Sequence, residues 1–469
     1  MDHTGARDGS GHRKDDAMDA DPTSSAMSRR VFLKAGGVMA AALGGAAALA
    51  NTPWNIASQL AGAAPLVVKR QLAASDGFMW LPGINQIAGT GIPGWSGFGP
   101  QSNGLYIFGF KDETTPAGGY KTFTQAVNDA KGKIQTSAPV LAVDESTELQ
   151  LRLANVSFQL RPDLADAHTI HWHGFRQAIP LFDGVPEVSV AVPQGRTFTY
   201  DYRPRDAGTY MYHCHFEDVE HVQMGMQGTL YVRPKQNLAG PIGGFSKFAY
   251  NDGDGSTGYH REFSLILNDL WTVPHINSLH IQESIWSDYD ANYWTINGRS
   301  YPDTIKPSGS LFPALPNGHP LKNSQPISSL IQVNPGDRVL LRFVNLGYEQ
   351  QAMQLQGIAM KVVGEDASYL RGPGGADESY ETDTIYIGSG ESRDVLFTAP
   401  AFSGSAGETD PTILPGNSFN RYLLMNRSLE RLNNNGTQVN GLGGQVTEVR
   451  VYAGGLPAQG LGDLNTTYV

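Results

Sequence analysis

A short segment of the sequence, YHCHFEDVEHVQMGMQG, places the chain's single cysteine, Cys214, between His213 and His215. His221 follows the cysteine by seven residues, and Met226 comes five residues later. A thiolate, imidazoles and a weak thioether are the ligands of a blue-copper site, because soft sulfur ligands suit Cu(I) while the geometry still tolerates Cu(II). The segment therefore predicts that Cys214, His221 and Met226 bind copper.

A second segment, HTIHWHG, contains His168, His171 and His173. Side chains point alternately to the two faces of a β-strand, so His171 and His173 share one face. The second imidazole of the copper site should come from a strand beside that of Cys214. We expect His168 to supply it.

The same alternation directs His213 and His215 away from Cys214, to the opposite face of their strand. Four imidazoles can then converge on a second metal centre: His171, His173, His213 and His215. This centre would be connected to the first by the covalent path from Cys214 to its neighbours. Six of the chain's 12 histidines lie in these two segments, so we interpret the pattern as metal binding rather than as isolated core histidines.

Two longer segments, VLAVDESTELQLRLAN and LIQVNPGDRVLLRFVN, alternate apolar and polar residues across a turn, as half-buried antiparallel strands do. They align at an offset of 190 residues, so that Arg152 meets Arg342 and Asn155 meets Asn345. Downstream, HTIHWHG meets QAMQLQG and GTYMYHCH meets NRYLLMNR in the same order. Similarity in the same order indicates an internal repeat. We predict two tandem copies of an all-β unit, each a sandwich or Greek-key barrel.

The boundaries of the copies follow from the turn-rich stretches. We place the first copy at residues 104–235 and the second at 262–456, with a linker at 236–261. The linker contains NDGDGS, which resembles the start of a calcium-binding loop. Phe263 occupies the position where such a loop needs a bidentate glutamate, so we expect an ordinary turn.

Charge and the N-terminal sequence bear on partners and location. A net charge of −11 and scattered Lys and Arg residues argue against a nucleic-acid partner. Arg29 and Arg30 lie in SRRVFLKAGGVMAAALGGAAALA, which resembles a twin-arginine export signal. Its apolar run is too weak for the other interpretation, a membrane anchor. We therefore assign residues 1–63 to a signal region and expect a periplasmic, cell-surface or secreted protein without a stable membrane span.

The pattern HxxHxHG followed by HCH, a further histidine and a methionine resembles the copper motif pair of the multicopper oxidases. This is the family of laccases, ascorbate oxidase and ceruloplasmin. The stretch DGVPEVSVAVPQGRTFTYDYRPRDAGTYMYHCH is also similar to that family. The resemblance covers nearly the whole mature chain and implies two tandem cupredoxin-like Greek-key β-sandwich domains.

The resemblance also implies what the metal sites are. A type 1 copper would be bound by His168, Cys214, His221 and Met226. The other four histidines would form one half of a type 2/type 3 cluster, where dioxygen is reduced to water: His171, His173, His213 and His215. Two-domain laccases and copper nitrite reductases have a similar arrangement and are trimers, so the resemblance implies a homotrimer.

The second copy departs from this pattern at every ligand position that can be aligned. The replacements are Gln351, Gln354 and Gln356 for the first histidine trio, Met425, Asn426 and Arg427 for the HCH triplet, and Gln445 for Met226. A neutral amide is a poor copper ligand beside imidazole, and a guanidinium cannot ligate at all. We therefore predict that the second domain lacks recognised copper ligands.

Several functions remain open. The first is an oxidase that passes electrons from a type 1 copper to one or two coppers on the four histidines and on to dioxygen, with His275, His280 or another chain completing the site. The alternative is a blue-copper electron carrier or copper-binding protein without turnover. Nitrite reduction would need a further imidazole that this chain lacks. The reductant would be a small molecule, a metal ion or a redox protein. The acidic segment FEDVE either attracts a cation or a basic redox partner, or is a solvated loop.

Overall fold

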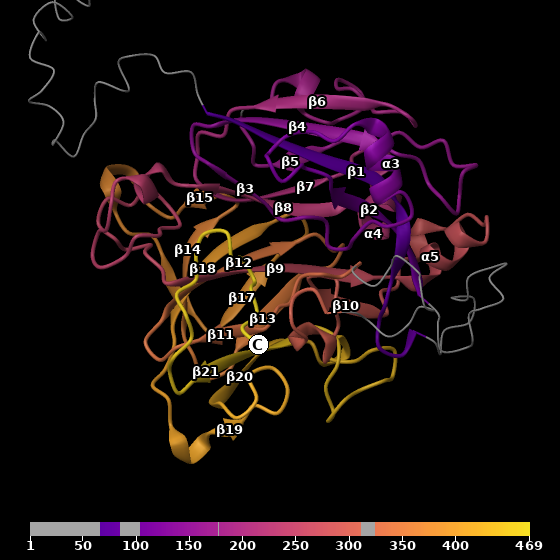
Figure 1. Ribbon diagram of the computed structural model, residues 1–469. Helices are drawn as coiled ribbons and strands as arrows, with labels where there is room; N and C mark the ends of the chain where they lie inside the picture. Colours follow the sequence, from indigo (N-terminus) through magenta and orange to yellow (C-terminus); the bar gives the residue numbers. More distant parts are fainter. Residues whose placement is uncertain (1–65, 85–103, 177, 311–323) are drawn as a thin grey trace, which may run out of the picture. The chain divides into compact units, whose positions relative to one another are not determined.

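The computed structural model describes residues 66–84, 104–176, 178–310 and 324–469, which belong to one structural unit. The predicted signal region lies outside these residues. Within them the chain folds into two β-sandwiches, coloured indigo to magenta and rose to yellow in Figure 1. No helix in this part of the chain is long and apolar enough to cross a membrane.

The first sandwich consists of two four-stranded sheets, ordered β2-β1-β4-β6 and β3-β8-β7-β5. Their strands are β1 (Val67–Met79), β2 (Leu105–Asp112), β3 (Leu141–Asp144), β4 (Glu148–Asn155), β5 (His171–His173), β6 (Thr197–Tyr202), β7 (Gly208–His213) and β8 (Gln227–Arg233). The helices α3 (Phe123–Ala130) and α4 (Asp218–Met224) belong to this half. The two histidine segments therefore lie on adjacent strands, because β5 pairs with β7.

The second sandwich has a seven-stranded and a six-stranded sheet, built on the orders β10-β9-β12-β18-β14-β15 and β11-β21-β20-β13-β17. The strands of the larger sheet are β9 (Arg261–Leu270), β10 (Tyr293–Ile296), β12 (Arg338–Asn345), β14 (Met360–Glu365), β15 (Ser368–Tyr369), β16 (Tyr380–Thr382) and β18 (Ser392–Thr398). Those of the smaller are β11 (Ile331–Val333), β13 (Gln351–Leu355), β17 (Thr384–Ile387), β19 (Glu408–Thr409), β20 (Ser418–Asn426) and β21 (Val446–Tyr452). Helix α5 (Thr272–Leu279) connects β9 to β10.

Short 3-10 turns join several of these elements. They are η2 (Pro180–Phe182), η3 (Lys235–Leu238), η4 (Trp286–Asp288), η5 (Asp303–Ile305), η7 (Pro373–Gly375), η8 (Gly404–Ala406) and η9 (Leu429–Arg431). The two largest hydrophobic clusters fill the spaces between the paired sheets, one in each half of the chain. The predicted all-β fold of two tandem sandwiches is confirmed.

The strand register reproduces the internal repeat residue by residue. His171 pairs with His213 between β5 and β7, and Gln354 pairs with Met425 between β13 and β20. These are the residues that the sequence alignment matched. The two halves therefore have the same strand pairing here, and the second carries amide and thioether side chains where the first carries imidazoles.

The first sandwich begins earlier than the predicted boundary at residue 104. Strand β1 lies inside its sheet, pairing with β2 on one side and with β4 on the other. From Gln71 onward every residue of β1 is buried, partly against Ala126 and Ala130 of α3. A strand buried on both faces shows no alternation of apolar and polar residues, so no periodicity marked this strand.

The second sandwich extends past the predicted boundary at residue 456. The buried side chain of Asn465 donates to the carbonyl oxygens of Ser264 and Ser328, at 3.0 and 2.7 Å, and accepts from the Ser264 amide at 2.7 Å. The C-terminal segment is thus hydrogen-bonded to β9, the first strand of the second sandwich. Polar residues without periodicity make this attachment, and no pattern in the sequence indicated it.

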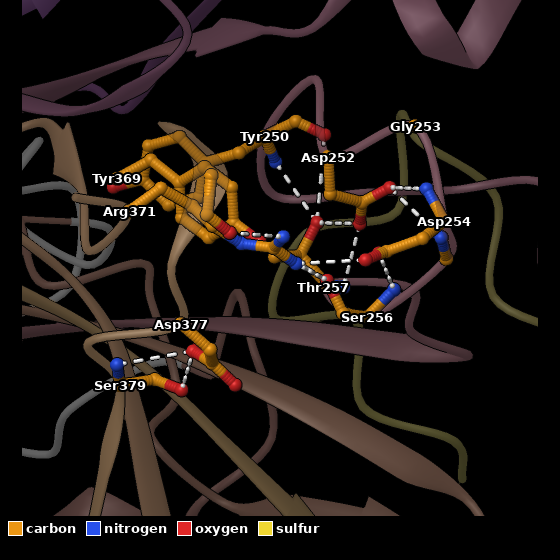
Figure 2. A network of polar contacts seen from close by, with 12 residues as sticks. Tyr250, Asp252, Gly253, Asp254, Ser256, Thr257, Tyr369, Arg371, Asp377 and Ser379 are labelled. Carbon is orange, nitrogen blue, oxygen red and sulfur yellow. Dashed lines mark hydrogen bonds and ion pairs between the residues drawn. The ribbon is translucent and has the colours of Figure 1, made fainter. Parts of the chain in front are cut away.

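The NDGDGS segment of the linker forms a closed turn, as Figure 2 shows. The carboxylate of Asp252 accepts hydrogen bonds from the amides of Gly255 and Thr257, at 2.9 and 2.6 Å, and from the Thr257 hydroxyl. Asp254 accepts from the Ser256 amide at 2.8 Å and from Arg371 at 2.8 Å. Protein donors thus occupy carboxylate oxygens that a calcium loop would offer to the ion.

A buried charge network joins the two sandwiches. Arg342 of β12 is fully buried and lies 3.0 Å from Glu262 and 3.4 Å from Asp394, both in the second sandwich. It also donates to the hydroxyl of Thr209 on β7 of the first sandwich, at 3.0 Å. Arg233 on β8 reaches across in the same way to Glu262, at 2.6 Å. The two halves are therefore docked through one buried network, in which Arg233 of the first half depends on Glu262 of the second for its carboxylate partner.

We expect Arg342→Met to lower the free energy of unfolding by about 3–5 kcal/mol, because it leaves two carboxylates buried without their shared cation. The matched control is Arg152→Met, at the repeat position of the first domain. The Arg152 guanidinium lies only half-buried over the ring of Tyr120, at 3.8 Å, so its loss should cost less than about 1 kcal/mol. Urea unfolding of both variants measures the difference, and equal losses would contradict the role of the network.

The free energy of unfolding of Arg342→Met should also depend on pH, because Arg342 stabilises the charged form of Glu262. Burial alone would raise the pKa of Glu262, but Arg342 and Arg233 lower it. In the wild type this stabilisation is complete above the ordinary carboxyl pKa of about 4.3 and is lost as the pH falls through the lower folded value. Without Arg342 the pKa of Glu262 rises. The difference in free energy of unfolding between wild type and variant should therefore become smaller as the pH falls from neutral to about pH 4.

Candidate metal centres

Cys214 follows β7 directly and brings three predicted ligands together. Its Sγ lies 3.2 Å from His221 Nδ1 and 3.9 Å from His168 Nδ1, and all three side chains are buried. The amide of Thr169 donates to the same sulfur at 3.4 Å. Two imidazole nitrogens and a sulfur therefore face one another from three different segments.

Met226 is tied to this group through the backbone. The Cys214 amide donates to the Met226 carbonyl at 3.0 Å, and the Met226 amide donates to the His221 carbonyl at 2.9 Å. Helix α4 carries His221 and is followed by its cap residue Gly225, where a Cβ would lie 2.8 Å from the carbonyl oxygen of Phe108. The side chain of Met226 is buried in the same cluster as Cys214. We call His168, Cys214, His221 and Met226 the thiolate site.

The electrostatics of the thiolate site suit a bound cation. Burial lowers the pKa of His168 well below its usual value, which keeps that imidazole neutral. Burial acts on His221 in the same direction, but Cys214 and Asp166 outweigh it and raise its pKa to about 10. Cys214 and Asp166 thus stabilise a positive charge beside His221, whether it is a proton or a bound cation.

The other predicted site lies on the opposite face of β5 and β7. His171, His173 and His213 bring one ring nitrogen each to within 4.8 Å of the others. His215 stands at the edge of this trio. Its ring centroid is 4.9 Å from that of His171, and its Nδ1 is 3.9 Å from a carboxylate oxygen of Asp218. We call His171, His173, His213 and His215 the four-histidine site.

Backbone carbonyls fix the ring orientation of the trio. The Nδ1 atoms of three histidines lie near carbonyl oxygens, His171 at 2.7 Å from Asp183, His173 at 3.1 Å from Gly390 and His213 at 2.8 Å from Cys214. A carbonyl oxygen only accepts, so the hydrogen bonds assign the proton to Nδ1 and leave each Nε2 with a lone pair.

These lone pairs provide a test of the fit to a metal. Burial lowers the pKa of His213 to about 3 and also lowers that of His171, so both rings stay neutral near pH 7. The Nε2 atoms of His173 and His213 are nonetheless only 3.0 Å apart. Two lone pairs that face each other at this distance repel unless a cation lies beside them, so the donor set fits a metal ion.

Two cavities open onto the four-histidine site. One of about 250 Å³ is bounded by His213, His215, Tyr348 and Ser389 among others. The second, of about 360 Å³, is bounded by His171, His173, Asp366 and Ser392 among others. Both have walls from each sandwich, so the second domain covers this site, although none of its described residues contributes an imidazole to the walls.

Other histidines named in the sequence analysis lie elsewhere. His275 is buried in α5, where its Nδ1 lies 2.6 Å from the carbonyl oxygen of Tyr106. Neither His275 nor His280 belongs to a group of ligand atoms close enough to hold an ion among the described residues. One group that the sequence analysis missed adds Asp166 and Glu217 to His221. The position of Asp166 in the sequence, two residues before His168, could have indicated this group.

Comparison with known proteins decides the family. Two family models, both described as multicopper oxidase, match residues 112–237 and 262–405, which together exceed half of the chain. The chain belongs to the multicopper oxidase family. Copper, the predicted cofactor, is the metal of that family, and the two cupredoxin-like domains agree with the predicted fold.

Similarity to individual multicopper oxidases is partial. Laccase-3 of Oryza sativa subsp. japonica is 28% identical over 235 residues, which are 49% of this chain and 34% of that protein. L-ascorbate oxidase of Nicotiana tabacum is 28% identical over 237 residues, 49% of this chain and 36% of that protein. The chain thus spans about a third of the length of these curated relatives. The crystal structure of the blue copper oxidase from Nitrosomonas europaea shares the fold, with a TM-score of 0.53 and 22% identity, over 82% of this chain and 86% of that one.

The second multicopper oxidase domain contains a hydrogen-bonded counterpart of the thiolate site. The Asn426 amide donates to the Gln445 carbonyl at 3.0 Å, which repeats the bond from Cys214 to Met226. The Gln445 amide donates to the Arg431 carbonyl at 3.1 Å, which repeats the bond from Met226 to His221. Arg431 is therefore the residue at the position of His221, which the sequence alignment did not find.

The four side chains of this counterpart bind one another. Asn426 Nδ2 donates to the side-chain oxygens of Gln351 and Gln445, both at 2.8 Å. Arg431 donates to the same Gln351 oxygen at 2.9 Å. Gln351 in turn donates to buried Asp269 at 3.1 Å. Amide and guanidinium groups thus link the same three segments that the thiolate site links in the first domain.

The positions that match the four-histidine site lie on a polar face of the second domain. Gln354 donates to a carboxylate oxygen of Asp383 at 3.1 Å, and the Gln356 amide lies 3.8 Å from the sulfur of Met425. Arg427 donates its backbone amide to the carbonyl of Ala352 at 2.9 Å. Imidazole is absent from all these aligned positions, as the sequence indicated.

We expect Asn426→Ala to lower the free energy of unfolding by about 2 kcal/mol, because the buried side-chain oxygen of Gln445 loses its donor. The copper content per chain should not change. The repeat position of the first domain provides the control, since Cys214→Ser should lose copper from the thiolate site. Urea unfolding and metal analysis measure the two effects, and a fall in copper content on Asn426→Ala would show that the counterpart is a metal site.

Proposed function

We propose that the chain is a copper-dependent oxidoreductase that takes electrons at the thiolate site and delivers them to dioxygen at the four-histidine site. The observation that carries this proposal is the place of Cys214 between the two sites. Its sulfur faces His168 and His221, while its chain neighbours His213 and His215 belong to the other site. One tripeptide thus connects the thiolate site, which would accept the electrons, to the four-histidine site, which has room for a small oxidant.

Copper, when bound, would supply reversible one-electron chemistry at the thiolate site and reduction of the oxidant at the four-histidine site. The residues of the chain prepare both sites for this. His168, Cys214 and His221 are at most 1% exposed, so the thiolate site is dry and its geometry is held by packing. The carbonyls of Asp183, Gly390 and Cys214 hold the histidine trio with Nε2 directed inward.

The carboxylates beside His221 suggest the class of reductant. Its Nε2 lies 3.6 Å from a carboxylate oxygen of Asp166, and Glu217 completes a group with them. Carboxylates beside the imidazole attract a cation and repel an anion. We therefore propose a metal ion, a cationic small molecule or a basic redox protein as the electron donor.

One observation favours a second candidate, a blue-copper electron carrier without oxidase turnover. The second domain presents Gln354 and Gln356 at the positions that correspond to His171 and His173, so it cannot supply the other half of an eight-histidine cluster. In a carrier the four-histidine site would hold no redox-active copper. Metal content and oxygen consumption separate the two candidates.

The function is tested with the full chain after copper loading. We expect about two or three coppers per chain and a strong visible absorption from the thiolate site. Cys214→Ser should abolish that absorption. The double variant His171→Ala/His213→Ala should keep it, lose the other copper and stop oxygen consumption with a reductant. If wild type and double variant both hold a single copper and neither consumes oxygen, the carrier takes the place of the oxidase.

Assembly is proposed from the exposed side of the four-histidine site. His171 and His215 keep 18% and 30% of their side-chain surface exposed, at the two cavities. We propose that further copies of the chain cover this side in a homotrimer. Light scattering of the copper-loaded protein should give three times the chain mass, and a monomer would remove the proposal. Export by the twin-arginine route, to a periplasmic, cell-surface or secreted location, stays a prediction from the SRRVFLK segment.

A further inference from the structure

One histidine of the four-histidine site is held by the other domain. His171 and His213 donate to carbonyls of the first domain, those of Asp183 and Cys214. His173 instead donates from Nδ1 to the carbonyl of Gly390, 217 residues further along the chain. Gly390 belongs to the turn between β17 and β18 of the second domain. The orientation of this ring therefore depends on how the domains dock.

The turn that carries Gly390 is fastened on both sides. The Gly390 amide donates to the carbonyl of buried Asn345 at 2.9 Å, and the Ser389 hydroxyl donates to the Gly347 carbonyl at 2.6 Å. On the other side, the hydroxyl of Ser392 donates to the carbonyl of Thr209 in the first domain, at 2.9 Å. The carbonyl of Gly390 is thus a fixed acceptor rather than part of a loose loop.

The contact also requires glycine at this position. Gly390 has a φ of +77°, which residues with a side chain rarely adopt. A Cβ there would lie 3.0 Å from Cε1 and 3.1 Å from Nδ1 of His173. Any side chain would therefore press on the edge of the ring that makes the hydrogen bond.

We propose that the second domain, whose aligned positions carry no copper ligands, positions a ligand of the first domain. The Gly390 carbonyl keeps the proton of His173 on Nδ1, so that Nε2 is free and directed at His213. A hydrogen bond to the far nitrogen of a metal-bound imidazole fixes its tautomer and orientation, and its loss typically lowers metal affinity 10- to 100-fold. Gly390 is a positioning residue in this inference, which rests on the proposed four-histidine site.

The chain offers a matched pair of variants to test this. Gly390→Ala adds a methyl group against His173 and strains the positive φ. Gly336→Ala strains a φ of +78° in another turn of the second domain, where a Cβ would meet nothing within 4 Å. The second variant therefore reports the effect of backbone strain alone. Differences between the two variants belong to the contact with His173.

The first readout is copper affinity in the full chain, measured by competition with a chelator. Gly390→Ala should weaken binding at the four-histidine site at least tenfold, while the visible absorption of the thiolate site stays the same. Gly336→Ala should match the wild type at both sites. Equal affinity of the two variants at the four-histidine site would overturn the inference.

The second readout needs no copper. In metal-free protein with ¹⁵N-labelled histidine, the Nδ1 proton of His173 should be protected from exchange in the wild type and in Gly336→Ala, and exposed in Gly390→Ala. An unchanged signal in Gly390→Ala would overturn the inference. If the wild type binds only one copper, the proposed oxidase function falls, and this readout still decides whether the second domain positions His173.

Discussion

The buried charge network around Arg342 and Glu262, which Arg233 and Thr209 of the first domain join, is the interaction on which the arrangement of the two domains depends. Ion pairs at a protein surface contribute little, but a buried cation shared by Glu262 and Asp394 cannot be removed without leaving unpaired charge in a dry interface. The hydroxyl of Thr209 bonds both Arg342 and Asp394, so the first domain takes part in the same network. Docking is thus specified by charge and geometry together.

This network is also continuous with the metal side of the molecule. Asp394 and Ser392 lie on β18, and Ser392 bonds the carbonyl of Thr209. Gly390 lies two residues before β18 and contacts His173. A shift of β18 relative to β7 would therefore move the carbonyl that orients the ring. The residues that bury charge between the domains and the residues that hold a histidine share one short segment.

The two domains solve the same structural problem in different ways. In each, a strand end, a following loop and a neighbouring strand meet at one buried point. The first domain brings Cys214 and imidazoles to that point, and the second brings Asn426 with amides and a guanidinium. Backbone bonds at this point are the same in both halves. Only the side chains decide whether the point can hold a metal.

Local spacing carried most of what could be predicted from the sequence. The motif around Cys214 and the HTIHWHG segment are short, so strand alternation alone assigned their residues to two sites. Arg431 was missed because Gln445 follows Asn426 by 19 residues, whereas Met226 follows Cys214 by 12, and the longer loop hides which of its residues corresponds to His221. Gly390 was missed because its contact comes through a backbone carbonyl, which no residue type marks.

The hydrogen-bonded counterpart in the second domain has a consequence for how the protein matures. Its bonds form among side chains that are present as soon as the chain is made, so this half can fold completely in a compartment without copper. Copper at the proposed sites of the first half would then enter a framework that the second half already supports.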